Sequence, residues 1–293
     1  MNTLKIHSKN FKQKVKFLTL IFLFTSVNFI FAQVGKDGAL TINATNTVLN
    51  RYTRVTADIP IGSNSITVFN INELNRDGIA YLPSGYTTNA SGFSSNELQT
   101  GDLILLFQAQ GAIINSTNTI SYGDVSSLNN SGRYEMAYVG SVAGNVISLD
   151  CKTRFAYFSS NYVQVVRIPQ YTTLTVNSGA SVVPIKWGDS AFGGADPSAA
   201  TRRRGGFLGL LANNIVNNGA IQANEAGFRG GTILNGSPPS GDVYYSDFFY
   251  NITSRAGEKG ESIAGYRPDY DAMGGRYGRG APANGGGDPN AFL

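Results

Sequence analysis

Histidine is nearly missing from this 293-residue sequence, which holds only His7. That residue lies in an N-terminal segment that we expect to be removed on export. A mature chain without histidine cannot form a Ser-His-Asp triad, a Cys-His pair or a zinc site with histidine ligands. Enzymes that depend on such sites are therefore excluded.

Cysteine is equally scarce, since Cys151 is the only one. A single cysteine cannot form an intramolecular disulfide, so core packing or bound ions must hold the fold. A catalytic thiolate would need a basic partner, and only Lys152 and Arg154 are close in sequence. We therefore expect Cys151 to be a small, half-buried residue at the end of a strand.

Long apolar runs are also rare, and the main one occupies residues 17–31. Five lysines precede it and Ala32 follows it, which is the pattern of a secretory signal peptide. The run is shorter than the ~20 residues of a membrane-spanning helix. We predict a signal peptide over residues 1–32, no membrane span after its cleavage, and a location outside the cell or on its surface. An uncleaved N-terminal anchor is the alternative.

The excess of basic residues disappears with this segment. Of the 23 Lys and Arg residues, five lie in the signal peptide, so 18 remain against 19 Asp and Glu. The mature chain is then close to neutral. Its charge gives no reason to expect nucleic acid or an anionic membrane as a partner.

Residues 33–170 are predicted to form an all-β domain, either a sandwich or a barrel-like sheet. Residues 103–107 are continuously apolar, which indicates a central strand covered on both faces. Residues 65–69 alternate between apolar and polar side chains and should have one solvent-exposed face. Residues 71–76 allow a short helix. The expected strands are Ala39–Ile42, Ser65–Phe69, Asp102–Phe107, Tyr134–Val139, Val146–Leu149 and Tyr162–Ile168.

Residues 171–272 have short apolar pairs that end in Asn-Gly or Ser-Gly. Such corners are typical of a β-solenoid-like region, whose coils bury apolar residues against their neighbours. A meander of hairpins with Asn-Gly turns explains the same pattern, and both interpretations stay open. Residues 273–293 are Gly-rich and end without a closing strand, which we interpret as a sign of truncation.

Several segments resemble one protein family, and they stand in the expected order along the chain. They are residues 101–112, Gly132–Glu135, Gln164–Tyr171, Asn224–Gly231 and Glu258–Glu261. Together they are similar to the N-terminal region of the large cell-surface gliding-motility adhesins of Bacteroidota. The similarity covers nearly all of the mature chain, and none of its strings is a catalytic signature.

The resemblance implies a repetitive, mostly β protein that is exported by the type IX pathway and displayed outside the outer membrane. The implied partners are a surface polysaccharide or the substratum, and other cell-surface or motility proteins. Members of the family carry long repeat arrays and a C-terminal secretion domain. We therefore expect this chain to be the N-terminal part of a longer protein or a truncated product.

Acids alternate with tyrosines in the last quarter of the chain. Aromatic rings cover the apolar face of a sugar and carboxylates accept hydrogen bonds from its hydroxyls, which predicts a carbohydrate contact. Paired carboxylates would also suit glycoside hydrolysis, and a lyase would use calcium with a base such as Arg229 or Lys259. Solvated acids and packing tyrosines explain the same residues, and that interpretation is favoured. The candidates are Asp242, Tyr244, Tyr245, Asp247, Tyr266, Asp269, Tyr270 and Asp271.

Two further patterns can be interpreted either as ordinary structural features or as binding sites. Residues 202–204 are consecutive arginines that would suit an acidic partner or an anionic polysaccharide, but a solvated turn is favoured. Asp37 and Asp77 each precede a glycine and are the calcium candidates, but they do not fit an EF-hand loop and should be turn residues. No cofactor or metal site is expected.

The whole sequence predicts a non-catalytic extracellular adhesin segment that supports attachment and gliding. Its many neutral Asn, Thr and Tyr side chains both donate and accept hydrogen bonds, as contact with glycans requires. The alternatives are a secreted β-solenoid polysaccharide lyase or glycoside hydrolase, a carbohydrate-binding module, and a segment that only caps or exports a repeat array.

Overall fold

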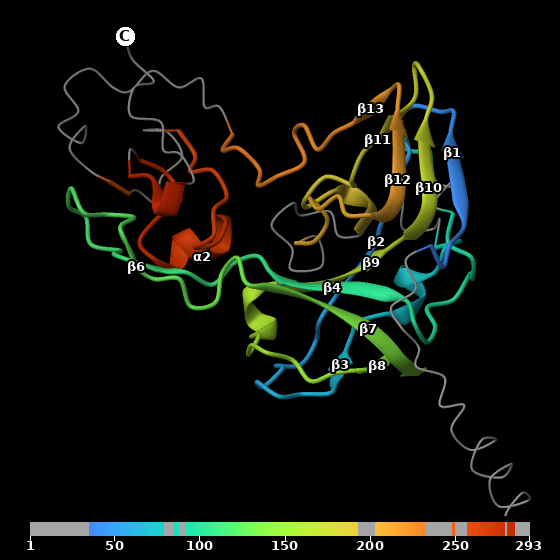
Figure 1. The fold of residues 1–293 in the computed structure, drawn as a ribbon. Helices are drawn as coiled ribbons and strands as arrows, with labels where there is room; N and C mark the ends of the chain where they lie inside the picture. The colour runs from blue at the N-terminus through green and yellow to red at the C-terminus, as the bar shows by residue number, and fades with distance from the viewer. Residues whose placement is uncertain are drawn as a thin grey trace, which may run out of the picture. The chain divides into compact units, whose positions relative to one another are not determined.

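The computed structural model describes residues 35–78, 85–87, 92–192, 203–232, 248–249, 257–278 and 280–284. These residues are mostly β, as predicted (Figure 1). The predicted signal peptide lies outside them. No helix in these ranges combines the length and the apolar character needed to cross a membrane.

The described strands are short, and the helices are shorter still. The strands are β1 (Ala39–Ile42), β2 (Arg51–Arg54), β3 (Ser65–Thr67), β4 (Leu103–Gln108), β5 (Ile113–Ile114), β6 (Val125–Ser127), β7 (Tyr134–Ala143), β8 (Val146–Leu149), β9 (Val163–Ile168), β10 (Gln170–Val176), β11 (Ser181–Val182), β12 (Leu211–Asn217) and β13 (Ala220–Ile221). The 3-10 helices are η1 (Ile71–Leu74), η3 (Ser159–Asn161), η4 (Ser190–Phe192) and η7 (Pro282–Asn284), and the α-helix is α2 (Arg267–Ala272).

Within the described ranges, an antiparallel sheet runs in the order β2-β9-β4-β7-β8-β3. Strand β4 pairs with β9 on one side and with β7 on the other, and five of its six residues are buried. This confirms the prediction of a central strand at residues 103–107. Strand β3 alternates between exposed and buried residues, which confirms its wet face, and η1 is the short helix expected near residue 71.

The two faces of this sheet pack into separate apolar cores. Ile104 and Val165 point into one core, while their neighbours Leu105 and Val166 point into the other, together with Phe192. Side chains alternate between the faces of a strand, so a continuously apolar strand supplies both cores. Each fully buried side chain of this size contributes about 1.5–3 kcal/mol relative to exposure.

A second sheet is parallel and has the order β1-β10-β12. Its strands stack in register, so that Leu40 lies beside Leu174, and Leu174 beside Ile215. One corner further along the chain, β11 pairs with β13, again in parallel. Stacked parallel strands are the arrangement of a solenoid, whereas a hairpin meander pairs antiparallel strands. The pairing therefore supports the solenoid-like interpretation of this region.

The first coil of the parallel stack comes from the N-terminal end of the described chain. The antiparallel sheet, residues 51–168, is consequently inserted between the first coil and the second. Asp37 fastens the first coil, because its carboxylate accepts hydrogen bonds from the backbone N–H groups of Ser94 (2.8 Å) and Gln170 (2.7 Å). The pairing of β1 with β10 thus crosses the boundary predicted at residue 170, and the domain division itself stays a prediction.

Candidate functional site

The residues predicted to contact carbohydrate fall into two groups. Asp242, Tyr244, Tyr245 and Asp247 lie outside the described residues. The other four lie in or beside α2, where Tyr266 and Tyr270 are buried. The Tyr270 hydroxyl donates to the carbonyl oxygen of Gly265 (2.7 Å), so this ring packs inside the fold. Carbohydrate contact through these residues stays a prediction.

The acids around α2 are paired with arginines. Burial would raise the pKa of Glu258, but hydrogen bonds from Arg267 and Thr232 leave it below its ordinary value. A general acid at neutral pH needs the opposite shift. The cluster therefore has the character of structural cross-links. Its pairs are Arg203 with Asp269 (2.6 Å), Arg229 with Glu261 (2.7 Å), Arg267 with Glu258 (2.6 Å) and Arg276 with Asp271 (2.9 Å).

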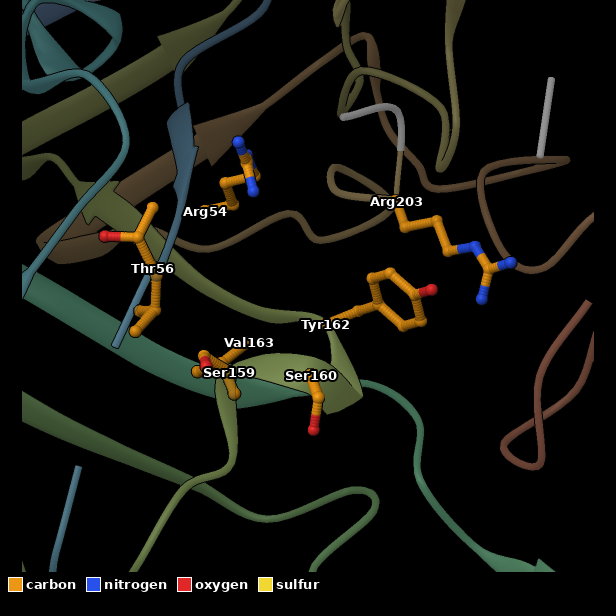
Figure 2. Close-up of a pocket in the computed structure, with 8 residues that line it drawn as sticks. Arg54, Thr56, Ser159, Ser160, Tyr162, Val163 and Arg203 are labelled. Carbon is orange, nitrogen blue, oxygen red and sulfur yellow. The ribbon is translucent and has the colours of Figure 1, made fainter. Parts of the chain in front are cut away.

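The arginine run at residues 202–204 is not a solvated turn. Arg203 and Arg204 are buried, so that expectation is wrong for both. Figure 2 shows the Arg203 side chain beside the ring of Tyr162, with the guanidinium carbon 4.1 Å from the ring centroid. Arg204 donates to Glu73 (2.8 Å), because a buried arginine needs a carboxylate partner. That partner is 131 residues away, so the local sequence could not reveal it.

The structure also bears on the expectations for Cys151 and for the two calcium candidates. Cys151 is exposed rather than half-buried, and desolvation together with Asp150 raises the pKa of its thiol, which disfavours the reactive thiolate. Of the calcium candidates, Asp37 bonds backbone N–H groups as described above, and Asp77 pairs with Arg76 (3.1 Å). In the described ranges, no group of three or more His, Cys, Asp or Glu residues is arranged to hold a metal ion.

A groove of about 520 Å³ lies on the inserted sheet and is the first candidate site. Its walls are η1, the loop that leads into β4, and the end of the β7–β8 hairpin. We call it the η1 groove. Its lining residues are Ile71, Asn72, Asn75, Glu97, Leu98, Gln99, Thr100, Ser141, Val142 and Gly144.

The wall formed by η1 is fixed by asparagine side chains. Asn70 begins the helix, since its side-chain oxygen accepts from the N–H of Asn72 (3.1 Å). Asn145, in the turn between β7 and β8, accepts from the N–H of Ile71 (3.0 Å). Capping of this kind satisfies N–H groups that a short helix leaves open. The helix and the hairpin turn are thereby joined.

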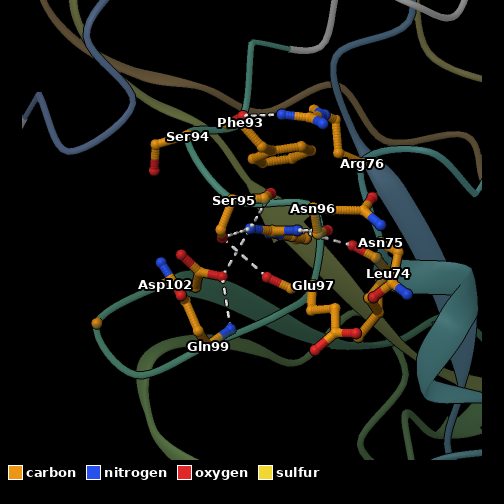
Figure 3. A network of polar contacts seen from close by, with 12 residues as sticks. Leu74, Asn75, Arg76, Phe93, Ser94, Ser95, Asn96, Glu97, Gln99 and Asp102 are labelled. Atoms are coloured by element: carbon orange, nitrogen blue, oxygen red, sulfur yellow. Dashed lines mark hydrogen bonds and ion pairs between the residues drawn. The ribbon is translucent and has the colours of Figure 1, made fainter.

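A buried arginine of β9 holds the opposite wall. Arg167 donates to the carbonyl oxygens of Leu74 (3.1 Å) and Asn96 (3.0 Å), one on each wall, and forms an ion pair with Asp102 (2.8 Å). Figure 3 shows this network, with Leu74 and Asn75 on one side of it and Asp102 on the other. Arg51 of β2 adds a second tie, to the carbonyl oxygen of Arg76 (2.7 Å). The buried guanidinium groups of Arg167 and Arg51 thus hold the walls of the groove in place.

The loop that leads into β4 is closed by a tight turn. The second carboxylate oxygen of Asp102 accepts from the N–H of Gln99 (2.9 Å), and Lys36 pairs with the first. Gly101 has φ +81°, a left-handed conformation that glycine adopts without a steric penalty. This turn presents the Gln99 side chain to the groove.

The groups that face the groove are mostly neutral. The side-chain amide of Gln99 and the hydroxyl of Ser141 have no hydrogen-bond partner among the described residues, and both residues are exposed. An amide both donates and accepts, as a sugar hydroxyl does. Ile71 and Val142 add apolar surface, and Glu97 is the one acid among the lining residues. The arrangement suits a polyhydroxylated ligand and holds no nucleophile with a base beside it.

Sequence reasoning did not select these residues. The available signal was local, because Asn70, Asn72 and Asn75 surround a segment already expected to be a short helix. The second wall gave no signal, since Asp102, which holds the turn at Gln99, pairs with Arg167 from a distant strand.

No protein-family model matches this chain, and no curated protein does either. Among solved structures, similarity is found to the tailspike gp61 of Pseudomonas phage phi297 (13% identity, 51% of this chain and 24% of that one) and to the tailspike gp49 of Pseudomonas phage LKA1 (11%, 50% and 24%). A third is the gp54 tailspike of Acinetobacter baumannii bacteriophage AP22, solved with a capsular saccharide (15%, 62% and 23%). Each has a TM-score of 0.23, and this chain spans about a quarter of the length of each.

Proposed function

We propose that this protein is a non-catalytic, cell-surface adhesin segment that binds neutral polysaccharide in the η1 groove. The observation that carries the proposal is the groove itself, about 520 Å³ in volume and lined by amides and hydroxyls on walls tied by buried arginines. Fixed walls lower the entropy lost when a ligand binds.

The expected affinity for one sugar unit is low. A net hydrogen bond contributes about 0.5–1.5 kcal/mol, and the groove offers only a few unpaired polar side chains. An adhesin does not need a tight single contact, because many weak contacts along one polysaccharide add up through effective concentration. Weak, repeated binding is what the geometry supports.

The proposal of a non-catalytic role rests on the carboxylates. The acids around α2 that the structure describes each contact an arginine; they are Asp269, Asp271, Glu258 and Glu261. Lyase or hydrolase activity remains the rival. It is tested by incubating the purified chain with neutral and acidic polysaccharides and measuring new reducing ends and unsaturated products. Turnover on any of them would overturn the non-catalytic role.

Binding is tested by affinity electrophoresis of the full chain in gels that contain dextran, xyloglucan or another neutral polysaccharide. We expect retardation by at least one of them. Gln99→Ala and Asn72→Ala should each weaken it about three- to tenfold, the equivalent of one net hydrogen bond. The matched control is Asn64→Ala, an exposed asparagine outside the groove. Retardation that survives both groove variants, or none in any gel, contradicts the proposal.

The location is tested on whole native cells. An antibody to residues 33–293 should detect a protein that external protease removes. A protease-resistant band confined to the periplasm would contradict display at the surface. If residues 33–293 belong to a longer protein, a matched strain that lacks them should keep the remainder on display but lose attachment, whereas lost display would favour a capping or export role.

A further inference from the structure

A second pocket, separate from the η1 groove, opens between β2, η3 and the start of β9. Its volume is about 280 Å³, just under the about 300–1,000 Å³ typical of small-molecule sites, so it has room for one sugar unit. Figure 2 shows Arg54 on one side, and Tyr162 and Arg203 on the other. The lining residues are Arg54, Val55, Thr56, Ser159, Ser160, Tyr162, Val163 and Arg203.

Among the described residues, Arg54 forms no ion pair, although Glu73 lies close enough to interact with it electrostatically. Its guanidinium carbon lies 4.2 Å from the centroid of the Phe69 ring, which fixes its orientation. Its Nε is buried and makes no hydrogen bond, and no carboxylate of the described chain lies within ion-pair distance. A buried N–H donor without an acceptor is destabilising, and a ligand oxygen would supply the missing acceptor.

Two arginines line the pocket, and the acids near it lie outside its lining. Arg203 also lines it, and its Nε is likewise buried without a hydrogen bond, although its Nη1 bonds Asp269 and Gln110. The nearby acids have hydrogen-bond partners other than Arg54, and Glu73 also interacts with Arg54 electrostatically. Asp58 accepts from the N–H and hydroxyl of Ser159 (both 2.8 Å), and Glu73 pairs with Arg204. No acid is among the lining residues.

Tyr162 contributes an aromatic wall in an unusual backbone conformation. Its φ of 59° and ψ of 62° are left-handed, which is rare and strained for a bulky residue. Such conformations concentrate at sites that clamp a ligand. The ring offers an apolar surface beside the two arginines, as the CH face of a sugar requires.

We propose that this pocket binds a sugar unit that carries a carboxylate, a hexuronate, with the Arg54 guanidinium on the carboxylate and the Tyr162 ring against the sugar. Arginine is suited to this task, because its planar fork matches the two oxygens of a carboxylate. The inference adds an acidic-sugar site to the proposed function and uses no residue of the η1 groove.

The test is isothermal titration calorimetry of the full chain with glucuronate, glucose and acetate as probes. Glucuronate should bind at least tenfold more tightly than either glucose, which lacks the carboxylate, or acetate, which lacks the sugar. Arg54→Gln should remove this advantage, whereas Arg133→Gln should keep it. Arg133 is the matched control, because it also stacks on a ring, that of Phe155 (4.9 Å), but lies outside the pocket.

Three results would overturn the inference: glucuronate no tighter than glucose, acetate as tight as glucuronate, or unchanged binding by Arg54→Gln. If Arg54→Gln does not fold, the test is made by NMR on the wild type. The Nε–H resonance of Arg54 must then shift on titration with glucuronate. The two sites are distinguishable. Gln99→Ala should leave glucuronate binding intact, and Arg54→Gln should leave binding of neutral polysaccharide intact.

Discussion

Arg51, Arg167, Arg203 and Arg204 have the largest fully buried side chains of the described chain. Each donates to carbonyl or carboxylate oxygens of segments far away in sequence. Burial lowers the pKa of Arg51 to about 10, which still leaves it charged at neutral pH. In a protein with one cysteine, these residues provide the cross-links that disulfides provide elsewhere.

The ion pair of Arg167 with Asp102 gives a first prediction at this scale. Arg167→Met should lower the free energy of unfolding by about 3–5 kcal/mol, the usual effect of leaving one partner of a buried pair behind. It should also abolish binding in the η1 groove, because both walls lose their shared donor. Urea unfolding and affinity electrophoresis measure the two effects. Arg133→Met, at an exposed arginine, should change neither, and full binding by folded Arg167→Met would show that Arg167 does not position the groove.

Lys259 gives a prediction about pH. It is fully buried, and its Nζ donates to the carbonyl oxygens of Phe248, Gly278 and Gly280. Burial lowers its pKa to about 7, against about 10.4 in an unfolded chain. Between these values the unfolded chain binds more protons, so stability rises with pH. Below about pH 7 both states are protonated and the contribution is constant.

Comparison with Lys259→Met isolates this effect. The stability of the wild type relative to the variant should rise by up to about 1.4 kcal/mol per unit between about pH 7 and pH 9. The measurement is urea unfolding at a series of pH values. Lys152→Met, at an exposed lysine, is the control and should show no such trend. A difference that does not vary with pH would mean that Lys259 keeps an ordinary pKa in the fold.

At the scale of elements, the parallel stack is stabilised by its middle coil. Leu174 of β10 is fully buried, while Ile215, its partner in β12, is 47% exposed. Leu174→Ala should therefore destabilise the protein by about 2–5 kcal/mol, and Ile215→Ala by about 1 kcal/mol or less. Chemical denaturation of both variants checks this. Equal losses of stability would mean that the Ile215 side chain is buried in solution.

The elements differ in how far the sequence could predict them. Residues 103–107 are apolar without interruption, and this local property sufficed to place the central strand. The pairing of β1 with β10 could not be foreseen, because it joins residues such as Leu40 and Leu174 across the whole inserted sheet. Helix α2 was not expected either, since its six residues are too few to show a helical period.

The candidate sites, too, depend on long-range contacts that the local sequence does not reveal. The burial of Arg203 and Arg204 depends on Asp269 and Glu73, which only the tertiary fold brings near. Likewise, the pocket at Arg54 depends on Tyr162, 108 positions later in the printed sequence. A local pattern gives the residue types that suit a glycan, but tertiary contacts decide which of them stay unpaired.

At the scale of the whole molecule, the β1–β10 ladder closes a long loop around the inserted sheet. Thr41 and Thr175 are partners in this ladder. In a Cys151→Ser background, a disulfide between Thr41→Cys and Thr175→Cys closes about 130 residues and should stabilise the protein by about 2–4 kcal/mol. Urea midpoints of the oxidised and reduced forms measure this.

A short loop supplies the control. Ala143→Cys with Val146→Cys bridges partners at the end of the β7–β8 hairpin. This closes only a tight turn and should stabilise the protein much less, because the entropy removed grows with loop length. Equal shifts for the two disulfides would show that the β1–β10 ladder does not close the loop in solution.

The inserted position of the antiparallel sheet also determines how tension passes through the chain. A pull applied between residue 35 and residue 221 runs from β1 across the ladder to β10 and β12, which are parallel neighbours. It loads the hydrogen bonds of that ladder together, in shear, rather than peeling them apart one by one. Residues 51–168 lie inside the loop that β1 and β10 close, so the direct path of the force bypasses them until this ladder ruptures. Contacts such as those of Lys36 with Asp102 and of Asp37 with Ser94 pass part of the force into them. The η1 groove lies within those residues, so a pull that the ladder resists reaches the groove through side-chain contacts such as those of Lys36 and Asp37.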